Sequence, residues 1–318
     1  PHCNFGTEYE VCRLAKKLNV PVLLWGPRDE CPDENGMRLR DSQCGLFATG
    51  KVLRRFGIPF TYLKNCNLED ECFAEGIDRF LRVCNVVKAF RNTRVLQIST
   101  RPFDFWSTMC NEGELLEKFG IQLSPIPMPE LTQAMKDVKE NSPEEIKEVT
   151  DYCREKMCIK VTPEQLDNVA ALKIAMTRLG KKYGCNCGAI QCWNALQDEI
   201  GIMPCAANAL CNDEGFPIAC ETDIHGTITS VLVEAAGMGE TRSFFADWTV
   251  RHPYNDNAEL LQHCGPWPIS IAKEKPTIDT PVAFDCSGSL MAQAKDGEHI
   301  SLVRFDGDNG EYSLLLGN

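Results

Sequence analysis

The sequence lacks several features that would assign it at once to a common class of protein. No apolar run reaches the ~18 residues that a membrane-spanning helix needs, so we expect no membrane span and no membrane partner. Basic residues are in the minority, with 33 Lys and Arg against 45 Asp and Glu and a formal net charge of −12. Because nucleic-acid phosphates are bound by a basic surface, we expect no nucleic-acid partner either.

The beginning of the chain also lacks the parts of a secretory signal. It opens with Pro1-His2-Cys3-Asn4, without a Met and without a charged segment followed by an apolar one. We therefore expect the chain to be the interior of a longer protein, with the final run YSLLLGN cut off within a domain. Internal repeats and low-complexity segments are absent as well, which argues against a repeat protein.

Cysteine, by contrast, is abundant, with 18 residues in a chain of 318. A small secreted domain would use so many cysteines as a disulfide framework. This chain is 43% hydrophobic and long enough for a large core in two or three domains, so it does not need one. Several cysteines, such as Cys84 and Cys192, lie inside apolar runs, where a thiol behaves as a small buried hydrophobe. We expect reduced thiols and a cytoplasmic location.

Strand and helix patterns alternate along most of the chain. Continuous apolar runs predict buried strands at 20–25, 60–63, 95–98, 188–193 and 216–220. Helical spacing predicts helices at 7–18, 46–56, 68–90, 112–119 and 222–236, the fourth ending at Gly120. Two further helix starts are indicated by Ser142-Pro143 and Thr162-Pro163, each with Glu or Gln at the third helical position. The alternation predicts an α/β fold, and the short strands and turns after Gly237 predict a mainly β segment.

Three apolar segments each end in a side chain that can bind a metal. Glu221 follows the strand at 216–220, Asp247 ends FFADW, and His263 ends LLQH. Carboxylates with one imidazole suit Mn²⁺ or Mg²⁺ better than a thiolate cage for Zn²⁺. Each residue also has a structural interpretation: Glu221 as an acid at a helix N-terminus, Asp247 as a turn residue and His263 as a core histidine. His225 and His252 are weaker candidates.

Taken in order, these motifs resemble one known family. The runs GFPIACETDIHGTITSVLVEAAG, FFADWT and HCGPWP resemble the metal-binding region of the L-fucose/L-arabinose isomerases, and PHCNFGTE, LLWGPRDE and DSQCG resemble the end of that family's first domain. The resemblance implies two Rossmann-like α/β domains followed by a partial β-rich C-terminal domain. We therefore predict boundaries at 1–92, 93–237 and 238–318, the first being the C-terminal part of its domain.

The resemblance also implies an activity and a set of roles. It implies an aldose–ketose isomerase for a pentose, a 6-deoxyhexose or a related modified hexose, with one divalent metal, usually Mn²⁺ but also Mg²⁺ or Co²⁺. Glu221, Asp247 and His263 would be the ligands, and Glu221 and Asp247 would also move protons through an enediol. Gln43 is the implied substrate contact for a neighbouring subunit in a homo-trimer or homo-hexamer, and Trp248 is a candidate pocket wall.

One departure from the family pattern concerns a histidine. The family has a further active-site histidine in its C-terminal domain, and nothing after HISLVRF matches it. His299 comes too early and lies inside a strand pattern, so we expect that histidine to be missing from this fragment. The fragment by itself is therefore expected to be incomplete for turnover.

Two other functions remain open from the sequence. One is a cysteine-ligated metal or iron–sulfur protein, because Cys185, Cys187 and Cys192 lie close together, with three more cysteines at 205, 211 and 220. Their spacing matches no usual zinc or cluster pattern, and Cys192 falls in a predicted strand. The other is a non-catalytic sugar-binding protein of the same fold, since a fold does not fix a function.

Overall fold

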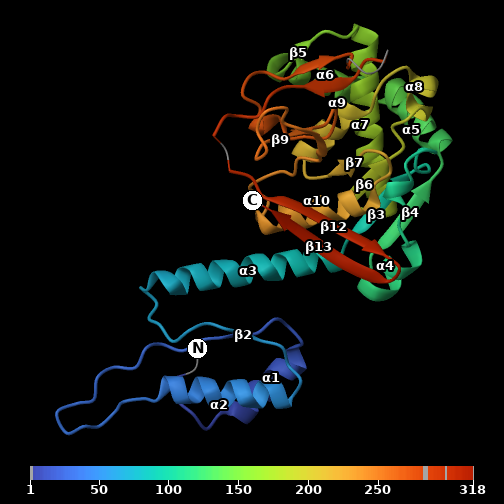
Figure 1. Cartoon of the computed structure of the whole chain (residues 1–318). Helices are drawn as coiled ribbons and strands as arrows, with labels where there is room; N and C mark the ends of the chain where they lie inside the picture. Colours follow the sequence, from blue (N-terminus) through green and yellow to red (C-terminus); the bar gives the residue numbers. More distant parts are fainter. Residues whose placement is uncertain (1–2, 282–285, 298, 318) are drawn as a thin grey trace. The chain divides into compact units, whose positions relative to one another are not determined.

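The computed structural model describes residues 3–281, 286–297 and 299–317 and divides into two compact units, Pro1–Asn85 and Val86–Asn318 (Figure 1). The model is mixed α/β, with parallel sheets, as the alternation of patterns predicted. The division into three domains at 92 and 237 stays a prediction. Among the described residues, no helix combines the length and the apolar character needed to cross a membrane.

The first unit is built on a small parallel strand pair. β1 (Leu23–Leu24) pairs with β2 (Thr61–Tyr62), and helices α1 (Glu8–Leu18) and α2 (Ser42–Arg55) pack together beside them. All four elements were predicted, although both strands are shorter than their apolar runs. The core of the unit consists of buried Cys12, Leu24, Leu46 and Leu53. The next helix, α3 (Glu71–Arg91), contains the boundary between the two units, which falls after Asn85. None of its residues is fully buried.

A four-stranded parallel sheet forms the centre of the second unit. Its order is β4 (Gln122–Ile126), β3 (Arg94–Ile98), β6 (Cys187–Ile190) and β7 (Ile218–Ala219). Alternate residues of β3 enter different hydrophobic cores, Leu96 and Ile98 one and Val95 the other. Because both faces are covered, the strands read as continuous apolar runs rather than as an alternating pattern. β4 was not predicted, because Ser124 and Pro125 interrupt its apolar character.

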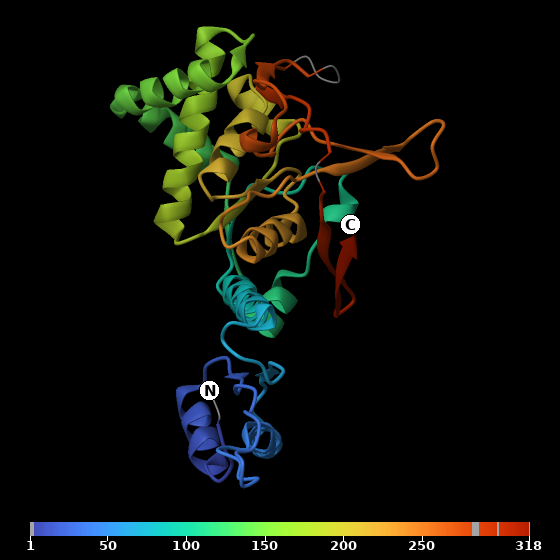
Figure 2. The ribbon, with the colours of Figure 1, turned by 90° about the vertical axis from the view of Figure 1, so that its left-hand side faces the viewer.

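Helices lie around the central sheet (Figures 1 and 2), and their residues supply most of the two cores. Residues of α5, α6, α7 and α9 lie in the larger core, and residues of α4 and α10 lie in the smaller one with Phe305. The helices of this unit are α4 (Glu112–Phe119), α5 (Met128–Asn141), α6 (Pro143–Lys156), α7 (Pro163–Tyr183), α8 (Ala195–Ile200), α9 (Cys205–Asp213) and α10 (Ile224–Ala236), with a 3₁₀ turn, η1, at Trp106–Thr108.

Local capping chemistry explains several of the helix ends. α4 ends at Gly120, whose φ of 75° is left-handed and therefore suits a residue without a side chain. Thr162 and Gln165 form the predicted capping box of α7, each side chain accepting a hydrogen bond from the other residue's backbone N–H. α6 begins at Pro143 as predicted, but the Ser142 side chain makes no cap hydrogen bond to it.

After Gly237 the described residues form strands and one short 3₁₀ turn, η2 (Ile269–Ile271), as the sequence predicted. β8 (Asp247–Arg251) and β9 (Glu259–Gln262) form an antiparallel hairpin, and β12 (Leu302–Asp308) pairs in the same way with β13 (Glu311–Gly317). β10 (Thr277–Asp279) pairs with β11 (Ser289–Met291) and with β5 (Cys158–Ile159). Most of the predicted strand at PVAF falls on 282–285, outside the described residues.

Candidate functional site

Glu221 lies at the carboxyl end of the central sheet. One residue, Cys220, separates it from the end of β7, and it lies in the turn that leads into α10. Glu221 and Thr222 both have positive φ angles, 53° and 52°, which are rare for residues with side chains. The turn is held by the segment that follows β3: the Thr222 hydroxyl donates to the Thr100 carbonyl at 3.0 Å, and the hydroxyl of Thr108, in η1, donates to the Glu221 carbonyl at 3.3 Å. Backbone strain of this kind is retained mainly where a site requires it.

His263 is the partner of Glu221. It follows β9 directly, its side chain is only 3% exposed, and its Nε2 lies 3.8 Å from Glu221 Oε2. The ring packs edge-on against Phe245, with the ring centroids 5.1 Å apart. Its other nitrogen, Nδ1, is buried and has no hydrogen-bond partner. An imidazole so placed, with one nitrogen facing a carboxylate and one unsatisfied, has the character of a metal ligand.

The surroundings of His263 favour its protonated form. Burial by itself lowers the pKa of His263, but hydrogen bonding to Cys264 and Glu221 outweighs burial and raises that pKa to about 10. The same contact with His263, together with hydrogen bonding to Cys205, lowers the pKa of Cys264 to about 5. The bound proton would have to leave before His263 could coordinate a cation.

Asp247 begins β8, opposite Gln262 in the hairpin. The described structure does not bring Asp247, Glu221 and His263 together as one group of ligand atoms within 4.8 Å of one another. Partial burial raises the pKa of its carboxyl, the charge of His263 lowers it, and the charge of Glu221 raises it again. Asp247 is thus within electrostatic reach of both other candidates, although its residue is exposed while they are largely buried. Two carboxylates and one buried imidazole are a suitable donor set for a divalent cation such as Mn²⁺.

Other acidic and imidazole groups near this sequence region have structural partners instead. Asp223 caps α10 by accepting from the Gly226 N–H at 2.9 Å, and it forms a two-pronged ion pair with Arg304. His225 is buried, and its Nδ1 contacts Asp306 at 3.0 Å. His252 accepts from the Tyr254 N–H in the turn of the β8–β9 hairpin. Each of these histidines therefore has a partner for Nδ1, although Nε2 of His225, like Nδ1 of His263, is buried without a hydrogen-bond partner.

The structure adds four thiols that the sequence reasoning did not connect with this site. Cys192 Sγ lies 3.2 Å from Glu221 Oε1, and Cys205 Sγ lies 3.6 Å from Cys264 Sγ. Cys220 contacts both Cys192 and Cys205. The predicted strand 188–193 was too long: β6 ends at Ile190, so Cys192 lies beyond the strand. The sequence does hold one indication of these thiols, because Cys220 directly precedes Glu221 and Cys264 directly follows His263.

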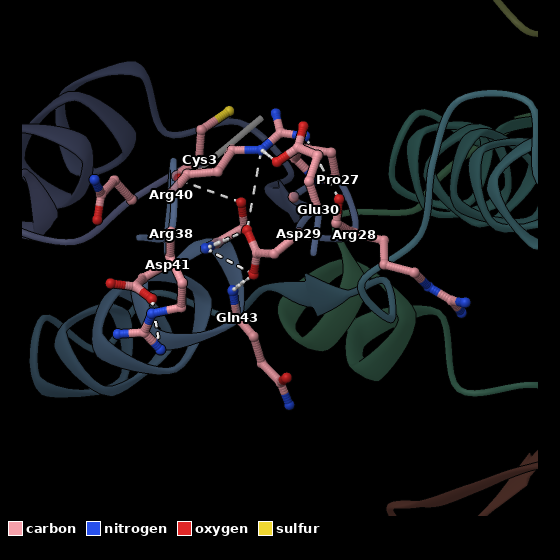
Figure 3. Close-up of polar contacts among 12 residues, drawn as sticks. Cys3, Pro27, Arg28, Asp29, Glu30, Arg38, Arg40, Asp41 and Gln43 are labelled. Atoms are coloured by element: carbon pink, nitrogen blue, oxygen red, sulfur yellow. Dashed lines mark hydrogen bonds and ion pairs between the residues drawn. The ribbon is translucent and has the colours of Figure 1, made fainter. Parts of the chain in front are cut away.

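Trp248 and Gln43 are both exposed. Trp248 lies on β8 with 62% of its surface exposed. Gln43 is in the first turn of α2, where its backbone N–H and that of Ser42 donate to Asp29, and its side chain points away from this network (Figure 3). Burial raises the pKa of Asp29, but these hydrogen bonds and Arg40 outweigh burial and lower it. An exposed side chain on an anchored helix start is available to another molecule, and both substrate roles stay predictions.

Comparison with known proteins finds similarity to sugar isomerases in each case. Residues 1–91 match the family model described as the N-terminal domain of fucose/sulfoquinovose isomerase. A sulfoquinovose isomerase from Alkalicoccus urumqiensis is 25% identical over 260 residues, 81% of this chain and 57% of that protein. A sulfoquinovose isomerase from Priestia aryabhattai is also 25% identical, covering 82% and 57%. An L-arabinose isomerase from Thermotoga petrophila is 25% identical over 258 residues, 78% of this chain and 50% of that protein.

The chain therefore spans a little over half the length of the sulfoquinovose isomerases that it matches. The domain model covers the first unit, and the relatives extend the match to most of the chain. Both sets of names agree with the family that the three motifs around Glu221, Asp247 and His263 resemble. Residues 1–91 are thus similar to the first domain of the fucose/sulfoquinovose isomerases, and most of the chain is similar to sulfoquinovose isomerases and L-arabinose isomerases.

Proposed function

We propose that this chain carries the metal and proton-transfer residues of an aldose–ketose isomerase. The observation that supports the proposal most directly is the approach of His263 Nε2 to Glu221 Oε2, at 3.8 Å, beside the carboxyl end of the sheet. Ligands of open α/β sheets bind at that end of the strands. The relatives named sulfoquinovose isomerase and L-arabinose isomerase support the same class of reaction.

Glu221, Asp247 and His263 would hold the cation, for which Mn²⁺ is our first choice and Mg²⁺ or Co²⁺ the alternatives. When bound, a divalent cation at this position supplies Lewis-acid stabilisation of the negative charge that develops on the sugar oxygens. The unsatisfied Nδ1 of His263 and the contact of its Nε2 with Glu221 fit such a ligand set. The thiols of Cys192 and Cys220 lie close to Glu221, so sulfur donors are present beside the oxygen donors.

The chain's own residues would move the protons. Isomerisation transfers one proton between C1 and C2 of the sugar through an enediol, and a second proton between the two oxygens. A carboxylate whose pKa is raised by burial, as at Asp247, is a better proton acceptor at neutral pH than a solvated one. Glu221, whose Oε2 lies 3.8 Å from His263 Nε2, would act on the opposite side. We also propose a cytoplasmic homo-oligomer, in which Gln43 and Trp248 contact the sugar.

For the substrate, we propose a pentose or a modified hexose. The relatives act, by their names, on sulfoquinovose or L-arabinose, so sulfoquinovose, L-arabinose and L-fucose are the first sugars to test. Ketose formation should be followed with the protein that contains this chain, and then with the variants E221Q and D247N. Each variant should lose at least ~100-fold in turnover, because each carboxylate has two roles.

A matched control keeps the interpretation specific. Asp151→Asn removes a carboxylate charge from the exposed face of α6, where Asp151 pairs with Lys147 and Arg154. This variant should turn over like the unmodified protein. If E221Q or D247N keeps more than about half of the unmodified rate, that residue has no part in the reaction. If all three sugars bind without being converted, the non-catalytic sugar-binding alternative replaces the proposal.

A further inference from the structure

A group of sulfur and oxygen donors lies immediately beside the proposed metal ligands. The ligand atoms of Cys192, Cys220 and Glu221 all lie within 4.8 Å of one another. In a tetrahedral zinc site, Zn–S of about 2.3 Å and Zn–O of about 2.1 Å place neighbouring ligand atoms roughly 3.5–3.8 Å apart. The Cys192 Sγ to Glu221 Oε1 distance of 3.2 Å is close to that spacing.

Both sulfur atoms already accept N–H hydrogen bonds. The backbone N–H of Glu221 donates to Cys192 Sγ at 3.3 Å, and the Asn208 side-chain amide donates to Cys220 Sγ at 3.5 Å. Asn208 is fully buried on α9, so its amide has no water to bind instead. The neighbouring thiols and burial hold the pKa of Cys192 and of Cys220 well above its usual value, so both sulfur atoms keep their protons until a cation displaces them. Once a cation is bound, the two N–H donors stabilise the negatively charged thiolates.

His263 lies beside this group without belonging to it, and a shift of its ring towards the two sulfur atoms would make it a fourth donor. Its side chain is 3% exposed, its Nε2 lies 3.8 Å from Glu221 Oε2, and its Nδ1 has no hydrogen-bond partner. Two thiolates, a carboxylate and an imidazole together make a donor set that soft or borderline cations prefer to hard ones. Zn²⁺ binds such sets in four-coordinate geometry, whereas Mn²⁺ favours oxygen and imidazole.

We propose that Cys192 and Cys220, with Glu221 and His263, form a second metal site that is selective for Zn²⁺ and that overlaps the proposed Mn²⁺ site through the two shared ligands. Since one carboxylate and one imidazole cannot serve two separate ions fully, Zn²⁺ and Mn²⁺ binding are mutually exclusive. Binding releases the two thiol protons and the proton of the His263 imidazolium to solvent, and leaves both sulfur atoms as thiolates and the imidazole neutral. Zn²⁺ is therefore a reversible inhibitor. Only the inhibition rests on the proposed isomerase function; the thiolate site does not.

Co²⁺ is a spectroscopic probe of this site, because a thiolate ligand gives Co²⁺ an intense near-ultraviolet charge-transfer band. The whole chain, reduced and metal-free, should develop that band on titration with Co²⁺ and lose it when Zn²⁺ is added. C192S and C220S should each weaken Co²⁺ binding by at least ~10-fold and reduce the band. A band of unchanged intensity and affinity in both variants contradicts the proposal.

Two control variants address other thiols. Cys66 and Cys72 lie close to Asp70 in the first unit and form a second group that could hold a cation. The double variant C66S/C72S should keep the charge-transfer band. If the band is lost in this variant and in no other, it arises from the Cys66–Asp70–Cys72 group, and the proposal is wrong. C211S changes a buried cysteine of α9 that hydrogen-bonds to Lys173 and Thr177, away from this donor set, and it should also keep the band.

One measurement requires no variant. X-ray absorption at the zinc edge of the unmodified chain should show two sulfur neighbours at about 2.3 Å, and a shell of only oxygen and nitrogen neighbours overturns the proposal. A competition experiment tests whether the two metal sites overlap. Zn²⁺ should displace Mn²⁺ from the protein, and electron paramagnetic resonance should detect the released Mn²⁺. If the sulfur shell is found but no sugar is converted, the thiolate site stands and the isomerase function fails. If sugar is converted but no sulfur shell is found, the isomerase function stands and the thiolate site fails.

Discussion

Nε2 of His263 lies 3.8 Å from Oε2 of Glu221. The two residues come from different sheets, because His263 follows β9 of the β8–β9 hairpin and Glu221 follows β7 of the central parallel sheet. The approach depends on the turn after β7, where two successive residues take left-handed angles. It also depends on the segment after β9, which Leu290 holds by donating its N–H to the Cys264 carbonyl at 3.2 Å.

If this pair is the centre of the metal site, changing either residue should weaken Mn²⁺ binding. H263N and E221Q each remove one donor while roughly keeping polarity and size, so we expect at least ~100-fold weaker binding in isothermal titration calorimetry. H225N changes a buried histidine that pairs with Asp306 instead, and it should bind Mn²⁺ like the unmodified chain. Equal affinities in H263N and the unmodified chain would falsify the ligand assignment.

Gly226 is required where α10 passes Phe245. A Cβ at this position would lie 2.4 Å from the Phe245 ring and 2.6 Å from an Asp223 carboxylate oxygen. G226A should therefore lower the free energy of unfolding by about 1–3 kcal/mol, because the crowded side chains must move. In G113A, within helix α4, the added Cβ would lie 3.5 Å from its nearest neighbour, Asn111 Oδ1, so this control should be neutral or slightly stabilising. Urea denaturation of both variants measures the difference.

Asp223 combines two functions that substitutions can separate. Its Oδ1 accepts from the Gly226 N–H at the start of α10, and its carboxylate pairs with Arg304 of β12. D223N keeps an oxygen that can cap the helix but loses the ion pair, whereas D223A loses both. We expect D223A to be less stable than D223N by about 1 kcal/mol, the usual value of an N-cap. Equal unfolding midpoints for the two variants would show that the cap contributes nothing.

His225 should make the chain less stable in mild acid. Burial lowers the pKa of His225, and the raising effects of Asp306 and Asp223, opposed by Arg304, do not fully offset it. The unfolded chain, with a histidine pKa near ~6.5, therefore binds this proton more readily than the folded chain. The contribution of His225 to stability is present above about pH 6.5 and is lost as the pH falls through the lower folded value.

H225N removes this titration while keeping a polar group near Asp306. Denaturation at about pH 7.5 and about pH 5.5 should show a larger loss for the unmodified chain than for H225N. The same loss in both proteins would assign the acid sensitivity to other groups. The exposed His252 is a control position, since its side chain lies in the hairpin turn, and H252N should behave like the unmodified chain.

Much of the fold could be predicted because local patterns and long-range packing agree. The apolar run at 95–98 is buried on both faces in β3, and the capping residues Thr162 and Gln165 mark α7. β4 was missed because its two inner residues, Ser124 and Pro125, do not resemble a buried strand. The strand at 188–193 was drawn too long because Cys192 is apolar in character, whereas in the fold it faces a carboxylate.

The site could be predicted only in part for a related reason. Each of Glu221, Asp247 and His263 follows or begins a strand, which a single sequence reveals. The approach of Cys192 and Cys205 to that position depends on where β6 and α9 lie in space, which no local pattern contains. For the same reason the sequence could not show that His225 faces Asp306.

The central claim is that Glu221, Asp247 and His263 hold a cation that the isomerisation of a sugar requires. The most direct test is turnover of sulfoquinovose, L-arabinose and L-fucose by the protein that contains this chain, first as purified, then after EDTA, and then after adding Mn²⁺. We predict ketose formation that EDTA abolishes and Mn²⁺ restores. Conversion that continues unchanged in EDTA, in protein shown to be free of metal, would contradict the account.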